Sequence, residues 1–198
     1  MLEVKNATIT IGGKTLAERL SFMAKDGQLT CITGNEGVGK TTLLRTLMGF
    51  LPVADGFVSV DGELLTIDSS QAFRCLMVYL PQEMRSLAHQ LNEPSWPESE
   101  AVEYAVWNQL LPRACKEEQP ESLTPEEIFR LTEKTLSEGS GKPIIIADEP
   151  AAFLPSDLTL RMLELLRSEA AGGKTVLVAS RKPQFIDYAD QVIHLKRL

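Results

Sequence analysis

The sequence has few cysteines. Only Cys31, Cys75 and Cys115 occur among 198 residues. An odd number at unrelated spacings does not indicate a disulfide framework, so we expect the chain to work in a reducing compartment. Cys31 lies within an apolar segment, where its expected role is that of a small buried hydrophobic side chain.

Long apolar runs are also absent. Nowhere do about 18 apolar residues follow one another, which is the length that a membrane-spanning helix needs. The first six residues, MLEVKN, lack the charged and then apolar pattern of a secretory signal. We therefore expect a cytoplasmic chain that does not itself cross a membrane.

Positive charge is scarce and scattered. The chain has 20 basic against 27 acidic residues, a net charge of −7. Because no run of Lys or Arg provides the attraction that nucleic-acid binding requires, we expect no nucleic-acid partner. A hydrophobic content of 43% is enough for one well-buried domain and excludes disorder as the main state.

The most informative segment, residues 34–42, reads GNEGVGKTT. It matches the phosphate-binding pattern G-x-x-x-x-G-K-[ST] at every fixed position. Glycines let successive backbone N–H groups surround phosphates, Lys40 would reach the β- and γ-phosphates, and the Thr41 hydroxyl would ligate Mg²⁺. The residues expected to bind the nucleotide are Gly34, Asn35, Glu36, Gly37, Val38, Gly39, Lys40, Thr41 and Thr42.

The flanking segments support this interpretation. Residues 28–33 are typical of a buried strand, and residues 41–48 of a helix whose N-terminus would direct its positive dipole at the phosphates. The alternative, a glycine-rich turn that precedes a helix by chance, does not account for the lysine, the threonine and the strand-loop-helix order together. We expect this chain to bind a nucleoside triphosphate.

Hydrophobic periodicity and turn residues predict an α/β fold. Apolar strands that alternate with helices indicate a mostly parallel sheet flanked by helices, preceded by an antiparallel β subdomain. Strands are expected at residues 1–10, 15–23, 28–33, 56–60, 63–65, 75–80, 143–148, 174–179 and 191–195. Helices are expected at residues 41–48, at 156–171 and from about 184.

The region from about 83 to 141 has a different composition. It is rich in proline and acidic residues, with helix-like pieces such as residues 99–107, and we expect a helical insertion. The prediction is one domain over residues 1–198, with 1–82 and 142–198 as the core. Trp96 and Trp107 are either docking contacts or buried anchors of the insertion.

Two acids follow an apolar strand at residues 144–147. Asp148 could hold Mg²⁺ opposite Thr41, and Glu149 could orient or deprotonate the water that attacks the γ-phosphate. The amide of Gln82, which follows another strand, could bridge the metal and the water. The alternative for the two acids is a strand that ends in solvated charges.

The order of these features resembles the ATP-binding cassette (ABC) ATPases over essentially the whole chain. The phosphate loop, Gln82, the helical insertion and the sequence IADEP at residues 146–150 carry the resemblance. It implies a P-loop NTPase fold, ATP and Mg²⁺ as ligands, and two cassettes that enclose two ATP molecules head to tail. It also implies membrane-spanning partner subunits and a peripheral position on the inner face of the cell membrane.

The chain departs from the family at the signature motif, LSGGQ, where LTPEE stands at residues 123–127. The sequence TPEE predicts a capping box, with Thr124 as N-cap, Pro125 at the first helical position and Glu127 turned back. We expect this helix start to be a poor clamp for the ATP of a partner cassette, since its N–H groups are already occupied. The alternative is an alignment error of a few residues.

Three further positions depart from the family pattern. Pro155 replaces an aspartate that would cross the dimer. Arg181 replaces a histidine and could contact the γ-phosphate with a permanent charge. Ile11 stands where an aromatic ring would stack on adenine, so the base would have only apolar packing.

Two hypotheses follow. The first is an ATP-hydrolysing transporter subunit, in which Lys40, Gln82, Glu149 and Arg181 act on the phosphates and Thr41, Asp148 and Gln82 hold the metal. The second is a hydrolysis-poor regulatory or structural partner in a heterodimer with another ABC ATPase, because a symmetric homodimer would pair two poor signatures with two good phosphate loops. A small-molecule kinase fits the residues less well.

Overall fold

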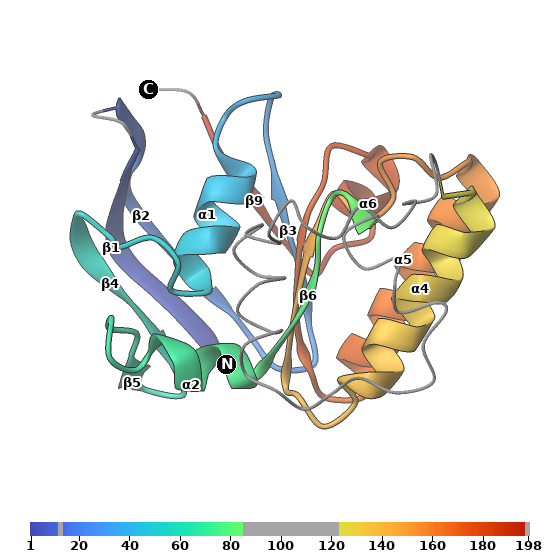
Figure 1. The fold of residues 1–198 in the computed structure, drawn as a ribbon. Helices are drawn as coiled ribbons and strands as arrows, with labels where there is room; N and C mark the ends of the chain where they lie inside the picture. The colour runs from blue at the N-terminus through green and yellow to red at the C-terminus, as the bar shows by residue number, and fades with distance from the viewer. Residues whose placement is uncertain (12–13, 85–122, 197–198) are drawn as a thin grey trace, which may run out of the picture.

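The fold is built from two sheets and the helices packed on them. A computed structural model of the chain describes residues 1–11, 14–84 and 123–196 (Figure 1). The larger sheet is parallel and follows the order β6-β7-β8-β3-β9. Its strands are β3 (Leu29–Thr33), β6 (Met77–Leu80), β7 (Ile144–Asp148), β8 (Thr175–Ala179) and β9 (Gln191–His194).

The central strands of this sheet are apolar because both faces are covered. Every residue of β3, β7 and β8 is buried. Alternate residues serve different cores: Ile144 and Ile146 of β7 belong to one hydrophobic cluster, and Ile145 and Ala147 to the other. This is the period of two that a strand imposes on its side chains.

The smaller sheet is antiparallel and lies beyond α1 (Lys40–Leu47), which packs between the two sheets (Figure 1). Its order is β2-β1-β4-β5. The strands are β1 (Leu2–Ile11), β2 (Lys14–Ala24), β4 (Asp55–Val60) and β5 (Glu63–Leu64). The first core joins the inner side chains of this sheet, α1 and one face of the parallel sheet.

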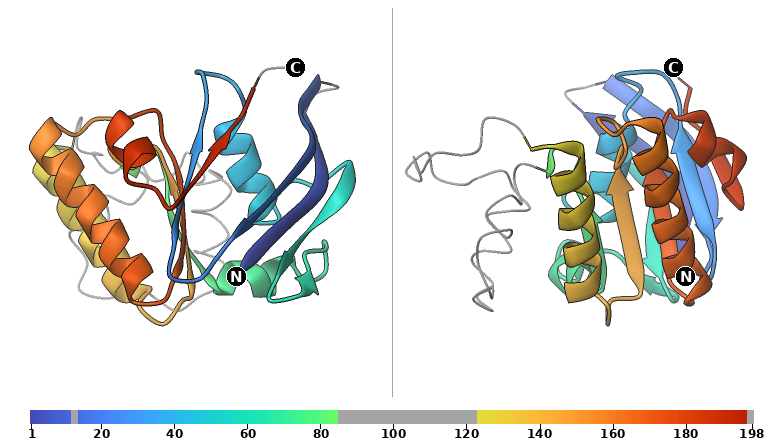
Figure 2. Two further views of the ribbon diagram at one scale, coloured as in Figure 1. Left: turned by 180° about the vertical axis from the view of Figure 1, so that it is seen from behind. Right: turned by 90° about the vertical axis from the view of Figure 1, so that its right-hand side faces the viewer.

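The opposite face of the parallel sheet is covered by helices. α4 (Pro125–Glu138) and α5 (Ser156–Ala171) lie side by side, with α6 (Pro183–Asp187) against α5 (Figures 1 and 2). Cys31 lies within the core beneath them and is fully buried, as the sequence predicts, and burial raises the pKa of its thiol to about 12. The thiol is therefore a packing element and not a reactive group.

Most element predictions are confirmed within one or two residues, and helix 156–171 has the predicted bounds. The strand predicted at 75–80 is β6, which starts two residues later at Met77, and the helix before it, α2 (Ser70–Cys75), is not among the predicted elements. A six-residue helix is too short to show a helical period. The expected helix at 99–107, both tryptophans and Cys115 lie outside the described residues.

The predicted mixture of a parallel sheet, flanking helices and an antiparallel subdomain is confirmed. Of the predicted helical insertion, α4 lies in the described part of the chain. The domain boundaries at 82 and 142 remain a prediction. Across the segments that the structure describes, we find no helix long and apolar enough for a membrane span.

A glycine fixes the end of α4 against the sheet. A Cβ atom on Gly139 would lie 2.3 Å from Cγ2 of Val78, which is buried in β6. Gly139→Ala should therefore lower the free energy of unfolding by about 2 kcal/mol, the usual cost of an overpacked core. Urea unfolding of the two proteins measures the difference.

Gly141→Ala is the matched control. Gly141 is exposed, and a Cβ atom on it would have no described atom within 4 Å, so this variant should stay within about 0.5 kcal/mol of the wild type. Equal stability of the two variants would contradict the packing that we describe.

Candidate nucleotide-binding site

The candidate site lies at the carboxyl ends of the parallel strands. The register aligns Asp148 with Ala179 of β8, and Ala179 with Ile32 of β3, so the three strands end at one level. The loop 34–39 leaves β3 at this level and leads into α1. In open parallel sheets this edge is where ligands bind.

Two glycines allow the loop its path. Gly34 has a φ of 152°, and a Cβ atom there would lie 2.6 Å from the carbonyl oxygen of Leu195. Gly39 has a φ of 103° and is the N-cap of α1. No side chain in the described part of the chain caps α1, and its first turn has no acidic residue. Its first N–H groups therefore remain available to an anion.

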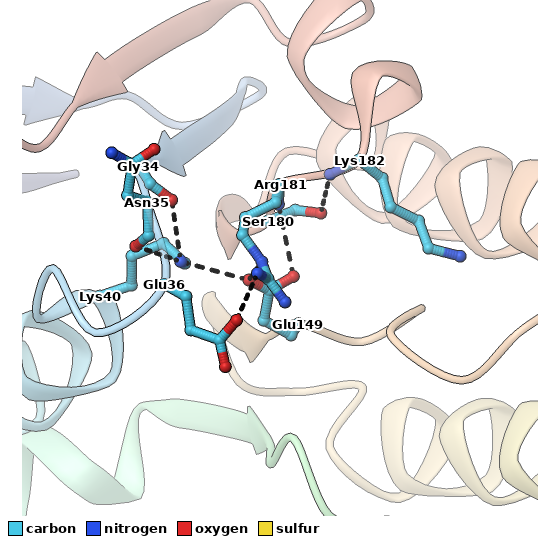
Figure 3. Close-up of polar contacts among 8 residues, drawn as sticks. All are labelled: Gly34, Asn35, Glu36, Lys40, Glu149, Ser180, Arg181 and Lys182. Carbon is cyan, nitrogen blue, oxygen red and sulfur yellow. Dashed lines mark hydrogen bonds and ion pairs between the residues drawn. The ribbon is translucent and has the colours of Figure 1, made fainter.

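Lys40 lies across the inside of the loop (Figure 3). Its Nζ donates to the carbonyl oxygens of Gly34 at 3.1 Å and Asn35 at 3.4 Å, and lies 3.4 Å from Oε1 of Glu149. The side chains of Lys40 and Glu149 are 8% and 9% exposed. A positive charge is thus held beneath the loop, next to the helix N-terminus.

Asp148 is the most buried charged group of the site, with 1% exposure. Burial raises the pKa of its carboxyl group, while a hydrogen bond from the Thr41 side chain lowers it. Among the described residues, its Oδ1 finds no hydrogen-bond partner. A buried carboxylate oxygen without a partner, beside a hydroxyl group, fits a hard cation such as Mg²⁺.

Glu149 has an unusual backbone. Its φ of 47° is left-handed, a conformation that costs a non-glycine residue about 1 kcal/mol or more. Two hydrogen bonds hold it there: its N–H donates to Ala179 O at 2.8 Å, and its carbonyl oxygen accepts from the N–H of Ala152 at 2.9 Å. In this conformation Oε1 of Glu149 lies 3.4 Å from Nζ of Lys40.

Arg181, which follows β8, also reaches this carboxylate. Its backbone N–H donates to Glu149 Oε2 at 3.3 Å, and its Nε lies 3.4 Å from Oε1. Its Nη1 lies 3.1 Å from Oε2 of Glu36 in the loop. The guanidinium group therefore joins the strand ends to the glycine-rich loop (Figure 3).

A cavity of about 330 Å³ opens over these groups. Most of the residues that the sequence singles out line it, including Gln82, which is exposed. The lining residues are Ile11, Leu16, Glu36, Gly37, Gly39, Lys40, Thr41, Thr42, Gln82, Asp148, Glu149 and Arg181.

Three of the residues that the sequence analysis expects to bind the nucleotide do not line the cavity, and their contact with a ligand remains a prediction. Val38 does not line the cavity, because its side chain is 5% exposed and packs in the core. Gly34 and Asn35 hold Lys40 through their carbonyl oxygens instead of lining the cavity. Leu16 lines the cavity and is not among the predicted site residues. Its apolar side chain early in the second strand of the predicted hairpin, close to Ile11 across the turn, is the sequence feature that could have indicated it.

Comparison with known proteins identifies the family. A family model described as "ABC transporter" matches residues 17–152. The chain belongs to this family. ATP and Mg²⁺ are the ligands of the ABC cassette, and the cavity, with its uncapped helix start and unpaired carboxylate oxygen, fits them.

Relatives of this ABC cassette are similar along nearly its whole length. It is 31% identical to a putative ABC transporter ATP-binding protein of Treponema denticola, over 92% of this chain and 38% of that protein. It is 29% identical to an ABC transporter ATP-binding/permease protein of Mycobacterium tuberculosis, over 98% of this chain and 24% of that protein. The chain thus spans less than two fifths of these two relatives.

A solved structure supports the fold. The dimeric, post-hydrolysis ATP-binding cassette MJ0796 bound to ADP and Pi superposes with a TM-score of 0.71 at 20% identity. The match covers 99% of this chain and 94% of that one. The match supports the cassette fold described above.

The start of α4, where the sequence analysis expects the signature motif, differs sharply from the start of α1. Thr124 Oγ1 accepts a hydrogen bond from the N–H of Glu127 at 3.3 Å, and Glu127 Oε2 accepts one from the N–H of Thr124 at 2.8 Å. The hydrogen bonds that the backbone N–H and the hydroxyl group of Thr124 donate to the carboxylate of Glu127 lower the pKa of that carboxylate. The predicted capping box is confirmed, with Pro125 in the first turn.

Removal of the buried charge at Asp148 provides a test of the site. Its pKa is higher in the fold than in the unfolded chain, so the ionised group lowers stability as the pH rises through that interval. Asp148→Asn should raise the free energy of unfolding of the nucleotide-free chain by about 1 kcal/mol at neutral pH. The gain should shrink at acidic pH, where the wild-type carboxyl group is neutral.

Thermal unfolding with and without Mg-ATP measures both consequences. Asp148→Asn should lose the rise in Tm that Mg-ATP gives to the wild type, because binding stabilises only a competent site. Asp68→Asn, at an exposed acid that does not line the cavity, is the control and should match the wild type in both measurements. A destabilised Asp148→Asn chain that keeps its response to Mg-ATP would argue against a cation at this position.

Proposed function

We propose that this chain is the ATP-hydrolysing cassette of an ABC transporter, peripheral on the inner face of the cell membrane. One observation carries the proposal: the uncapped start of α1, Lys40, the unpaired oxygen of Asp148 and the strained Glu149 face one cavity. Binding groups for a triphosphate, a cation and a water are thereby combined.

The loop and α1 supply the phosphate-binding groups. Backbone N–H groups at residues 34–42 and the helix dipole attract the phosphates. Lys40 now donates to two carbonyl oxygens, and phosphate oxygens would replace these as acceptors. Ile11 and Leu16 also line the cavity and would offer apolar packing to the adenine ring.

Thr41, Asp148 and Gln82 are the residues that would hold Mg²⁺. When bound, the ion would supply neutralisation of the charge that builds up on the phosphates. The Thr41 hydroxyl already contacts Asp148, so these two ligands are placed together before any ligand arrives. Gln82 borders the same cavity from the end of β6.

Glu149 is the proposed base for the attacking water. Its carboxylate now shares Oε1 between Lys40 and Arg181. A phosphate that draws Lys40 and Arg181 toward itself would free Glu149 to accept a proton from water. Arg181 would then stabilise the negative charge of the terminal phosphate, and its own charge does not depend on pH.

The proposal extends to the assembly. A second cassette, either another copy or a different chain, would complete each ATP site and close when ATP is bound. Membrane-spanning subunits would dock on the segment between about 82 and 107, most of which lies outside the described residues and for which the sequence predicts helices. The proposed organisation is a core of residues 1–82 and 142–198 with the insertion between them.

Phosphate release at a series of protein concentrations tests this function. With Mg-ATP, the rate should rise more steeply than linearly, because two cassettes form each site. Glu149→Gln should reduce turnover by about 100-fold or more while the chain still binds ATP, since it removes a general base and leaves the phosphate loop intact.

Glu63→Gln makes the same chemical change on β5, at an exposed residue that does not line the cavity, and should retain wild-type turnover. If Glu149→Gln hydrolysed ATP as fast as Glu63→Gln, the proposed role of Glu149 would be wrong.

A second candidate function follows from the capping box of α4. Because Thr124 and Glu127 occupy each other's donors, and Glu126 adds negative charge in the first turn, this helix start would repel a phosphate. The chain would then bind ATP in its own loop but serve poorly as the second half of a partner's site. It would act as the hydrolysis-poor member of a heterodimer.

Restoring the signature distinguishes the two candidates. The fourfold variant Thr124→Ser, Pro125→Gly, Glu126→Gly and Glu127→Gln gives residues 123–127 the sequence LSGGQ. If the capping box limits turnover, this variant should release phosphate at least about tenfold faster than the wild type at high protein concentration, despite a less stable α4. Equal rates would reject the second candidate, provided circular dichroism shows that the variant is folded.

A further inference from the structure

The ion pair between Glu36 and Arg181 connects two loops that the sequence places 145 positions apart. Glu36 lies at the exposed tip of the phosphate loop, with 87% of its side chain accessible, and Arg181 is half exposed. Both residues line the cavity. Since both side chains line the cavity and are exposed, the pair lies at the cavity mouth, and Figure 3 shows it beside Lys40.

The division of the guanidinium group between two acids is informative. An arginine beside a single carboxylate usually forms two parallel hydrogen bonds at about 2.7 to 2.9 Å. Here the Nη1 of Arg181 is directed at Glu36, at 3.1 Å, and only Nε faces Glu149, at 3.4 Å. Glu36 therefore competes with Glu149 for the same cation.

Loss of this competition has a predictable geometry. Without the charge of Glu36, the guanidinium group is free to turn and pair through two nitrogens with Glu149. Arg181 would then no longer extend across the cavity mouth, and Glu149 would be engaged by a closer cation. Neither the guanidinium group of Arg181 nor the carboxylate of Glu149 would then be available to the ligand.

We propose that Glu36 is a positioning residue that holds Arg181 across the cavity mouth, where the guanidinium group selects a triphosphate over a diphosphate. The inference rests on the proposed nucleotide-binding function. Glu36 itself is not assigned a contact with the reacting atoms, and it acts through Arg181.

The alternative role for an exposed acid at this place is simple repulsion. A carboxylate near the terminal phosphate disfavours a triphosphate more than a diphosphate, because the triphosphate carries the additional charge closest to it. Removal of Glu36 would then increase the preference for the triphosphate. The two roles predict changes of opposite sign.

The experiment is a double-mutant cycle on nucleotide preference. Dissociation constants of Mg-ADP and of the Mg complex of a non-hydrolysable ATP analogue are measured by calorimetry on the full chain. The variants are Glu36→Gln, Arg181→Gln and the double variant, with Glu63→Gln as the control for loss of an exposed acid. The measured quantity is the Kd for ADP divided by the Kd for the ATP analogue.

Arg181→Gln should lower this ratio about tenfold, as expected for loss of a hydrogen bond to a charged group. Glu36→Gln should lower it about threefold or more, although Arg181 is still present. In the Arg181→Gln background, Glu36→Gln should produce no further decrease. The control Glu63→Gln should leave the ratio unchanged.

An increased ratio in Glu36→Gln would overturn the inference, because it would show that Glu36 only repels the terminal phosphate. An unchanged ratio would also overturn it, because Glu36 would then have no role in the choice of nucleotide. Equal decreases from Glu36→Gln with and without Arg181 would also overturn it, since Glu36 would not be acting through Arg181. A wild-type chain that binds neither nucleotide would reject the proposed function itself. If the wild-type chain binds both nucleotides but the ratio does not fall in Glu36→Gln, only the role of Glu36 would be rejected.

Discussion

Compensation of buried charge is the constraint on which the site depends. Lys40, Asp148 and Glu149 are each less than one tenth exposed at the edge of an apolar sheet. An unpaired charge in such surroundings is strongly unfavourable, so each group must find partners or a ligand. Carbonyl oxygens and Glu149 satisfy Lys40, and Arg181 supports Glu149. Oδ1 of Asp148 has no hydrogen-bond partner among the described residues. A cation bound there would therefore offset the free-energy cost of burying this carboxylate.

The N-termini of α1 and α4 use their free backbone N–H groups in opposite ways. α1 begins at a glycine without side-chain acceptors, and its exposed dipole contributes to the cavity. α4 begins with an internal acceptor for its own N–H groups. A few residues at the start of each helix therefore decide whether it attracts an anion or supplies its own.

Local sequence signals predict much of this structure, and long-range contacts account for the rest. The bounds of α5 are predicted by its hydrophobic periodicity and the glycines that follow it, and the capping box at Thr124 by four consecutive residues. α2 was missed because six residues carry too little periodicity. The pairing of Glu36 with Arg181 was not predictable, because it arises only when the register aligns β7, β8 and β3 at one edge.

The left-handed backbone of Glu149 has a consequence for mutational drift. Glycine adopts this conformation without strain, and the glutamate codons lie one base change from glycine codons. Selection for foldability alone would therefore erode the glutamate at this position. The carboxylate of this chain therefore lies on a backbone that a single base change would relax, and the proposed role of Glu149 in hydrolysis would account for the glutamate.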